Sequence, residues 1–316
     1  MSVEDQLRLF WLKGITGGRG RRQLTTEKFI HPKYVTHSSA PTKGCVDLYV
    51  GKTSFSINFF SHEADRFASA CFESLIFDDS HARIPKSLGW PLIKAYYSAF
   101  FATHALFRIH GWACTRILPQ TTALLNKEAS VLYQDAAKID GGLYFLTASN
   151  AGASLHLESM DSVKGGSHEA LWAKLLPYFD ELSSTVLTLG EESEETQDLI
   201  ALIDRFAKFI EKKGGAVWFT QIRNRLNYSH DYGVWYPYEN STVDPKEIRG
   251  ALNGWLKSPA DNVPDISQSE LNQFAVACAF MISLCRLTIE DLAFRSGRLS
   301  PFHGSSKKLV QLARST

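Results

Sequence analysis

The stretch Leu92-Ile-Lys-Ala-Tyr-Tyr-Ser-Ala-Phe-Phe-Ala-Thr-His-Ala-Leu106 predicts a mainly α-helical protein. Its aromatic pairs, Tyr96-Tyr97 and Phe100-Phe101, recur at helical spacing within an expected helix over residues 88–110. We expect these aromatic side chains to pack in a core rather than to form a stacking platform for bases. His104 lies on the same helix, and we expect it to be a buried core histidine with satisfied hydrogen bonds.

Helical patterns dominate the chain from Ser61 onward. Ser61 and Ser167 each precede the tripeptide His-Glu-Ala, and both are expected to cap the N-terminus of a helix. The sequence shows no internal repeat and no sustained heptad register. We therefore expect a helical bundle, with helices over residues 61–77, 88–110, 120–138, 167–189, 194–213, 216–230, 245–257 and 267–296.

Sequence typical of β-structure is confined to two places. Near the N-terminus, Val46–Val50 and Ser54–Phe59 flank Gly51-Lys52-Thr53, which predicts a hairpin. This Gly-Lys-Thr is not a phosphate-binding loop, because valine stands at position 46 where that motif requires glycine. A second hairpin, Leu143–Ala148 with Ser154–Glu158, is expected inside a glycine-bounded insertion at about 141–166. The expected organisation is a β-containing segment (1–60), a helical domain (61–296) and a C-terminal tail (297–316).

Composition excludes several classes of protein. The 316 residues carry 34 Lys+Arg against 33 Asp+Glu, a formal net charge of +1, which excludes a globally basic nucleic-acid coat protein. The longest largely apolar stretch, Phe274–Cys285, has 12 residues and is too short to span a membrane. Five unclustered cysteines argue against a disulfide framework or a zinc site. Without a recognisable signal peptide, we expect a soluble, cytoplasmic protein with no metal and no cofactor.

One local basic element is the loop Gly17-Gly18-Arg19-Gly20-Arg21-Arg22. Its glycines make the loop flexible, and its three arginines are able to meet phosphate. The other interpretation is a solvated linker that follows a short N-terminal helix. Both interpretations stay open from the sequence.

The densest polar cluster is Trp218-Phe-Thr-Gln-Ile-Arg-Asn-Arg-Leu-Asn-Tyr-Ser-His-Asp-Tyr232, at the end of an expected helix. At about 100° per residue, Arg223, Asn227 and His230 share one stripe of that helix. Arg225 and His230 are about 140° apart on a straight helix. They converge only if the helix unwinds near His230 or if two subunits share the site.

These residue types suit cleavage of a phosphodiester in RNA. A histidine with a pKa near 6.5 moves protons at neutral pH, and an arginine neutralises the charge that builds on the phosphate. Asparagine and tyrosine position phosphate or sugar oxygens, and the 2′-OH is an internal nucleophile, so no metal is needed. Alternatively, His230 caps the helix beside Asp231, and Arg223 or Arg225 pairs with a core acid.

The segment from Arg225 to Tyr232 matches the pattern R-x4-H-x-Y and resembles the motif of the HEPN superfamily, especially the HEPN toxins paired with minimal nucleotidyltransferase antitoxins. Arg223-Asn224 with His230 fits the looser form of that motif. The stretch Leu92–Leu106 is similar to the Y-Y-x-x-F-x-A-x-x-A-L helix that opens many small prokaryotic HEPN domains.

The resemblance implies a HEPN-like bundle and a homodimer in which the motif helices of the two subunits face each other. It also implies a toxin or anti-phage effector that cleaves RNA under the control of an antitoxin or another regulatory protein. It implies catalytic roles for Arg223, Arg225 and His230, substrate contacts from Asn224, Asn227, Tyr228 and Tyr232, and nucleotidylation at Tyr232. Some HEPN branches lack the histidine and act as non-catalytic binding modules. Tyr228, which takes the histidine position in the Arg223 register, fits that alternative. A third possibility is an unrelated helical adaptor in which these residues are structural.

Overall fold

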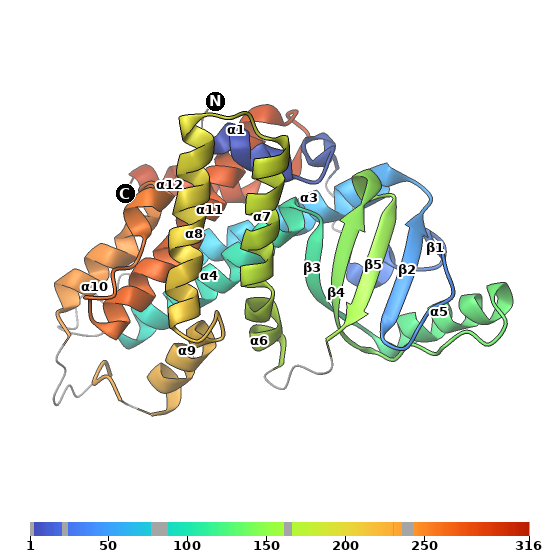
Figure 1. Ribbon diagram of the computed structural model, residues 1–316, viewed down its shortest axis with the longest axis horizontal. Helices are drawn as coiled ribbons and strands as arrows, with labels where there is room; N and C mark the ends of the chain where they lie inside the picture. The colour runs from blue at the N-terminus through green and yellow to red at the C-terminus, as the bar shows by residue number, and fades with distance from the viewer. Residues whose placement is uncertain are drawn as a thin grey trace.

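The protein is mainly α-helical, with most helices gathered at one end and a five-stranded sheet, accompanied by α2 and α5, at the other (Figure 1). The structure, a computed structural model, describes residues 3–20, 25–76, 88–160, 166–229, 231–235 and 243–315. The helices are α1 Val3–Leu7, α2 Thr26–Phe29, α3 Thr53–Ile76, α4 Gly89–Ile109, α5 Pro119–Leu132, α6 Gly166–Ala173, α7 Leu175–Leu189, α8 Glu194–Lys212, α9 Trp218–Tyr228, α10 Pro245–Leu252, α11 Glu270–Arg295 and α12 Ser305–Ser315. The strands are β1 Val35–His37, β2 Cys45–Val50, β3 Trp112–Ile117, β4 Gly142–Ser149 and β5 Ser154–Ser159.

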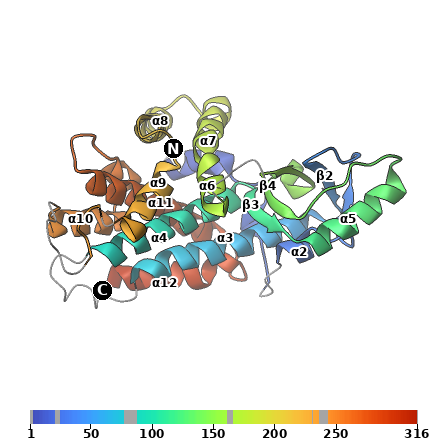
Figure 2. The same ribbon diagram turned by 90° about the horizontal axis from the view of Figure 1, so that it is seen from below.

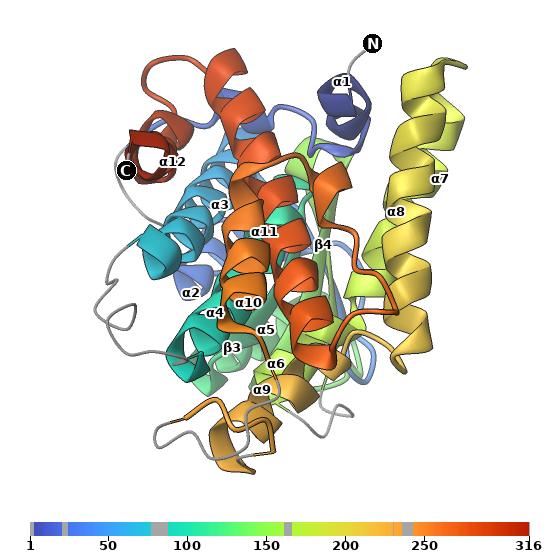
Figure 3. The ribbon, with the colours of Figure 1, turned by 90° about the vertical axis from the view of Figure 1, so that its left-hand side faces the viewer.

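Three long helices, α3, α4 and α11, form the centre of the bundle (Figures 2 and 3). Alanines 95, 99, 102 and 105 of α4 are buried, and their small side chains let its neighbours approach closely. The pair α7 and α8 packs outside this centre and joins it through Phe206, whose ring stacks on Phe280 of α11 with 3.8 Å between ring centroids. The expected mainly α class is therefore confirmed.

Helix α4 carries the aromatic stretch, as expected. Tyr96 and Phe100 are buried, Tyr97 and Phe101 are half-buried, and all four pack against the core. His104 is 7 % exposed and stacks on Phe67, so the prediction of a buried histidine is confirmed. The helix therefore contributes both to the core and, through Tyr97, to a partly exposed surface.

The sheet joins two parts of the sequence that we had treated separately. Its strand order is β1-β2-β5-β4-β3, and all neighbouring strands are antiparallel. The hairpin β4–β5 forms as predicted, but β5 also pairs with β2 from the N-terminal segment, with Leu48 opposite Leu155. The sequence did not predict β3, which pairs with β4 and completes the other edge. The N-terminal segment and the hairpin insertion are thus one structural unit.

The predicted hairpin at Val46–Val50 and Ser54–Phe59 is wrong. Val46–Val50 lies in β2, but Ser54–Phe59 forms the first turns of α3, in which buried Ile57, Phe60 and Ala64 recur at helical spacing. Ser61 is not a cap either, because it lies inside α3 and its Oγ donates to the Ile57 carbonyl at 2.7 Å. The alternation of Phe55, Ile57 and Phe59 resembled a strand only over six residues, whereas burial follows the helical period over the full helix.

Other predicted helices differ mainly at their ends. The helix expected over 167–189 is divided into α6 and α7 at Lys174, because Pro177 has no N–H to continue the helical hydrogen bonds and is tolerated in the first turn of α7. Ser167 is the second residue of α6 and so is not its cap. Helices over 120–138, 216–230 and 245–257 are shorter than expected, and the last gives way to a 3-10 turn at Asn253–Leu256.

The segment 297–316 contains helix α12, which packs along α3. Asp65 of α3 accepts hydrogen bonds from the backbone N–H and the hydroxyl of Ser306, at the start of α12. Burial raises the pKa of this carboxyl, and the Ser306 bonds oppose that shift. Within the described ranges, no helix has the length and apolar character needed to cross a bilayer.

Candidate functional site

Helix α9 holds the polar cluster by burying its apolar side. Trp218, Phe219, Ile222 and Leu226 are buried, and the Phe219 ring stacks on Trp172 at 4.4 Å between ring centroids. The opposite side of the helix therefore carries the arginines and asparagines. The helix ends at Tyr228, two residues before His230, and His230 lies outside the described residues. The expected stripe of Arg223, Asn227 and His230 is thus described only for its first two members.

The segment after α9 turns back onto the start of α4. The indole N–H of Trp235 donates to the Leu226 carbonyl at 2.6 Å, and the backbone N–H of Gly89 donates to Val234 at 3.3 Å. Glycine is required at position 89, because a Cβ there would lie 2.7 Å from the Trp235 ring. These contacts fix α9 beside α4, from which the tyrosines below project.

Arg223 faces α4 and has no acidic partner among the described residues. Its Nη2 donates to the Tyr97 hydroxyl at 2.7 Å, and its Nη1 donates to Asn224 Oδ1 at 2.8 Å. The guanidinium lies 5.7 Å and 5.6 Å from the ring centroids of Tyr96 and Tyr97, and Nε is buried without a hydrogen bond. Among the described residues, no carboxylate forms an ion pair with Arg223. Its positive charge is therefore available to an anion.

Arg225 has the opposite environment. Its Nε lies 3.1 Å from an Asp231 oxygen and its Nη1 lies 2.9 Å from Glu270 Oε2, while its guanidinium lies 4.6 Å from the Tyr232 ring centroid. The Tyr232 hydroxyl donates to the same Glu270 oxygen at 2.7 Å. Burial, followed by this contact with Glu270, raises the pKa of Tyr232. Two carboxylates thus neutralise Arg225 before any ligand binds.

The predicted site residues consequently fall into two groups. Arg223 and Asn224 form one group with the tyrosines of α4, and Arg225 and Tyr232 form the other with Glu270 of α11. Asn227 is half-buried, and Tyr228 is 75 % exposed at the end of the helix. Arg225 therefore pairs with acids, but with partly exposed ones rather than with a core acid, and Arg223 pairs with no carboxylate of a described residue.

Sequence reasoning missed one histidine beside Arg223. His168 of α6 has its Nδ1 2.8 Å from the Tyr96 hydroxyl, and its ring stacks on Phe100 at 4.3 Å between centroids. Burial, and then the positive charge of Arg223, lower the pKa of His168. In the sequence, the tripeptide that begins at His168 indicates only the start of a helix. Its distance in sequence from the motif hid its proximity in space.

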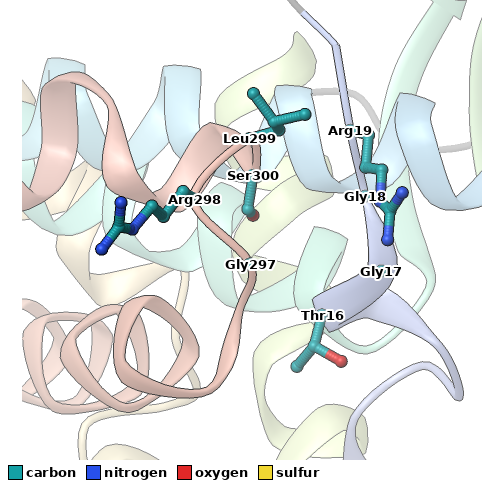
Figure 4. A pocket seen from close by; sticks show the side chains of 8 residues that line it. All are labelled: Thr16, Gly17, Gly18, Arg19, Gly297, Arg298, Leu299 and Ser300. Atoms are coloured by element: carbon teal, nitrogen blue, oxygen red, sulfur yellow. The ribbon is translucent and has the colours of Figure 1, made fainter.

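The basic N-terminal loop lines a small cleft with a second loop, residues 297–300 (Figure 4). The cleft has a volume of about 230 Å³, and Arg19 is exposed beside it, with its backbone N–H bonded to Asn58 Oδ1 at 2.8 Å. Figure 4 shows the Arg298 side chain extending away from the loop that holds Gly17 and Gly18. Arg21 and Arg22 lie outside the described residues, so the phosphate-contact interpretation of this loop stays a prediction.

No family model, no curated protein and no solved structure matches the chain. Within the part of the chain that the structure describes, no three His, Cys, Asp or Glu side chains gather as a metal site would require. A proposal for function therefore rests on α9 and the side chains that contact it.

Proposed function

We propose that this protein is a metal-independent endoribonuclease of the HEPN type, in which Arg223 binds the scissile phosphate of RNA. The observation that carries the proposal is the environment of Arg223, a half-buried guanidinium with no acidic partner among the described residues, beside His168, whose pKa burial and Arg223 lower. Tyr97 and Asn224 hold that guanidinium in place, so it needs little reorganisation when charge builds on a phosphate. Arg223-Asn224 with His230 fits the looser form of the HEPN motif, and this resemblance supports the same chemistry.

The reaction needs two proton transfers. A base takes the proton of the 2′-OH, whose oxygen attacks the phosphorus; the bond to the 5′ oxygen breaks, and that oxygen takes a proton from an acid. The products are a 2′,3′-cyclic phosphate and a free 5′-OH. His230 is the acid–base group that the motif implies, and His168 is a second imidazole beside Arg223. The lowered pKa of His168 keeps it unprotonated at neutral pH, which suits the base.

The resemblance extends the proposal to the assembly. In a homodimer the α9 helices of the two subunits would face each other, and the second subunit would bring further histidines to the site. Arg225 of one subunit could then meet His230 of the other, although the two residues would point in different directions on one straight helix. An enzyme that cleaves cellular RNA as a toxin or defence effector needs a partner that silences it. Tyr232 is the expected point of control, and its hydroxyl is tied to Glu270, which must release it before any nucleotidylation.

A second candidate function is a non-catalytic module that binds RNA, a nucleotide or a partner protein. The specific observation in its favour is that Asp231 and Glu270 already neutralise Arg225, the arginine that matches the motif best. Tyr228, 75 % exposed at the end of α9, would then present its ring for stacking.

Cleavage of total RNA in the presence of EDTA separates the two functions. We expect the wild-type chain to cut RNA and leave 2′,3′-cyclic phosphate ends, and His230→Ala and His168→Ala to cut far less. His156→Ala, which removes an exposed histidine of β5, is the matched control and should cut like the wild type. RNA binding without cleavage by the wild type, purified with and without the product of the neighbouring gene, would support the binding module instead.

A further inference from the structure

A second cavity lies where the helices meet the sheet, next to the α9 site, because Phe100 lines it and also stacks on His168. It has a volume of about 640 Å³ and is bounded by α3, α4 and the strands β3 and β4, which lie side by side in Figure 2. That volume is typical of sites for small molecules. Among the described residues, the lining of the cavity includes three arginines, Arg66, Arg108 and Arg116, and one carboxylate, that of Glu63. The lining therefore has an excess of positive charge.

Arg108 is the unusual member of this set, because its side chain is buried and forms no ion pair with any described residue. The residue is 2 % exposed. Its Nη1 lies 3.1 Å from His104 Nδ1, its Nη2 donates to the Cys114 carbonyl at 3.2 Å, and its buried Nε has no hydrogen bond. Burial lowers the pKa of Arg108 to about 10, and the charge of Glu63 only partly opposes that shift. A buried cation in this state is costly unless an anion accompanies it.

The carboxylate of Glu63 is already taken. Both of its oxygens accept hydrogen bonds from Arg66, each at 2.8 Å, in the paired geometry that arginine prefers. The Arg116 side chain, from β3, lines the cavity, is exposed, and forms no hydrogen bond or ion pair with any described residue. Arg108 and Arg116 are thus the two cations that Glu63 does not pair with.

His104 adds a neutral donor to the cavity wall. An arginine only donates hydrogen bonds, so His104 Nδ1 must accept from Arg108, and the ring proton lies on Nε2. Burial, and then the charge of Arg108, lower the pKa of His104 well below its usual value, so the ring is neutral at pH 7. The arginines and the His104 N–H thus supply the positive charge and the donors that an oxyanion requires.

We infer that this cavity binds a small anionic molecule, whose phosphate or carboxylate group pairs with Arg108 and Arg116. Phosphate and carboxylate share the planar pair of oxygens that a guanidinium recognises, and either would supply the missing partner of Arg108. The site uses none of the residues proposed for RNA cleavage. It stands or falls independently of that function.

Calorimetric titration of the full chain with AMP, adenosine and citrate tests the inference. AMP and adenosine differ only in the phosphate, and citrate supplies carboxylates without a phosphate. We expect saturable binding of AMP or citrate and none of adenosine, with the tighter of the two anions identifying the ligand class. Arg116→Ala and Arg108→Gln should each weaken binding at least about tenfold, because each removes one charged contact. Arg298→Ala, which removes an exposed arginine outside this cavity, should leave the affinity within about twofold of wild type.

Arg116 is exposed, so we expect Arg116→Ala to fold. If Arg108→Gln does not fold, the affinity of Arg116→Ala alone tests the inference. The inference is overturned if neither anion binds at millimolar concentration, if adenosine binds as tightly as AMP, or if Arg116→Ala binds like the wild type. RNA cleavage by Arg116→Ala should equal that of the wild type. Loss of anion binding with intact cleavage therefore separates this site from the α9 site.

Discussion

Arg223 and Arg225 lie two residues apart on α9, about 160° apart around the helix, and they contact different neighbours. Arg223 faces the tyrosines of α4, which fix its orientation without cancelling its charge. Arg225 faces Asp231 and Glu270, which cancel its charge. The difference teaches that an arginine in a motif is available to a phosphate only when the fold gives it neutral partners.

The largest expected effect distinguishes the two arginines by activity. Arg223→Ala should lower RNA cleavage in EDTA by at least about 100-fold, the usual loss when one donor to a developing oxyanion is removed. Arg225→Ala should lower it by less than about tenfold, because that side chain is already paired. Initial rates on one defined RNA, measured for both variants and for the control Arg205→Ala, which removes an exposed arginine of α8, give the comparison. Equal losses at positions 223 and 225 would contradict the assignment of the phosphate contact to Arg223.

Stability gives a second, smaller contrast. Tyr97→Phe removes the hydrogen bond that Arg223 donates at 2.7 Å, and the free energy of unfolding should fall by about 1 kcal/mol. Tyr232→Phe removes a donor to Glu270, but Arg225 still pairs with that carboxylate, so the loss should be about half as large. Urea denaturation of the two variants measures both. A larger loss for Tyr232→Phe would mean that the Glu270 cluster, rather than the tyrosines of α4, holds α9 in place.

The contrast between the two arginines could not be predicted from sequence. Arg223 and Tyr97 are 126 residues apart, and Arg225 and Glu270 are 45 apart, so local periodicity says nothing of either contact. The helices were predictable where the apolar pattern is long: residues 88–110 became Gly89–Ile109, and 267–296 became Glu270–Arg295. Short patterns were ambiguous, and Ser54–Phe59 became helix because tertiary burial, not local alternation, decided it. Polar density located α9, but the fold alone determined which arginine is free.

Removing one carboxylate partner of Arg225 should make this arginine more available to RNA, and so more like Arg223. Glu270→Gln keeps the size of the side chain and removes one of the two charges that neutralise Arg225. RNA affinity should rise by about threefold, and the dependence of log affinity on log salt should steepen by about one, as expected for one more phosphate contact. Glu290→Gln, about 30 Å further along α11, is the matched control and should change neither value. Fluorescence anisotropy with a labelled single-stranded RNA at several salt concentrations measures both quantities. No change on Glu270→Gln would show that Arg225 lies away from the RNA.

The smallest expected effect is the change in the pKa of His168 when the charge of Arg223 is removed. Burial is the larger cause of the lowered pKa of His168, and it remains when Arg223 is replaced. The charge of Arg223 is the second cause, so Arg223→Ala should raise the pKa of His168 part of the way towards its usual value, while Arg225→Ala should leave it unchanged.

The lowered pKa of His168 also makes the free energy of unfolding depend on pH. A histidine whose pKa is lower in the folded state is neutral there, so its contribution to stability is present above pH 6.5 and is lost as the pH falls through the folded-state value. Arg223→Ala should reduce that acid-side loss, because the two pKa values move closer together. NMR titration of the His168 ring, assigned with His168→Ala, measures the pKa directly in each variant. If Arg225→Ala raised the pKa of His168 as much as Arg223→Ala does, both arginines would act on the histidine equally. The assignment of Arg223 as the nearby charge would then be wrong.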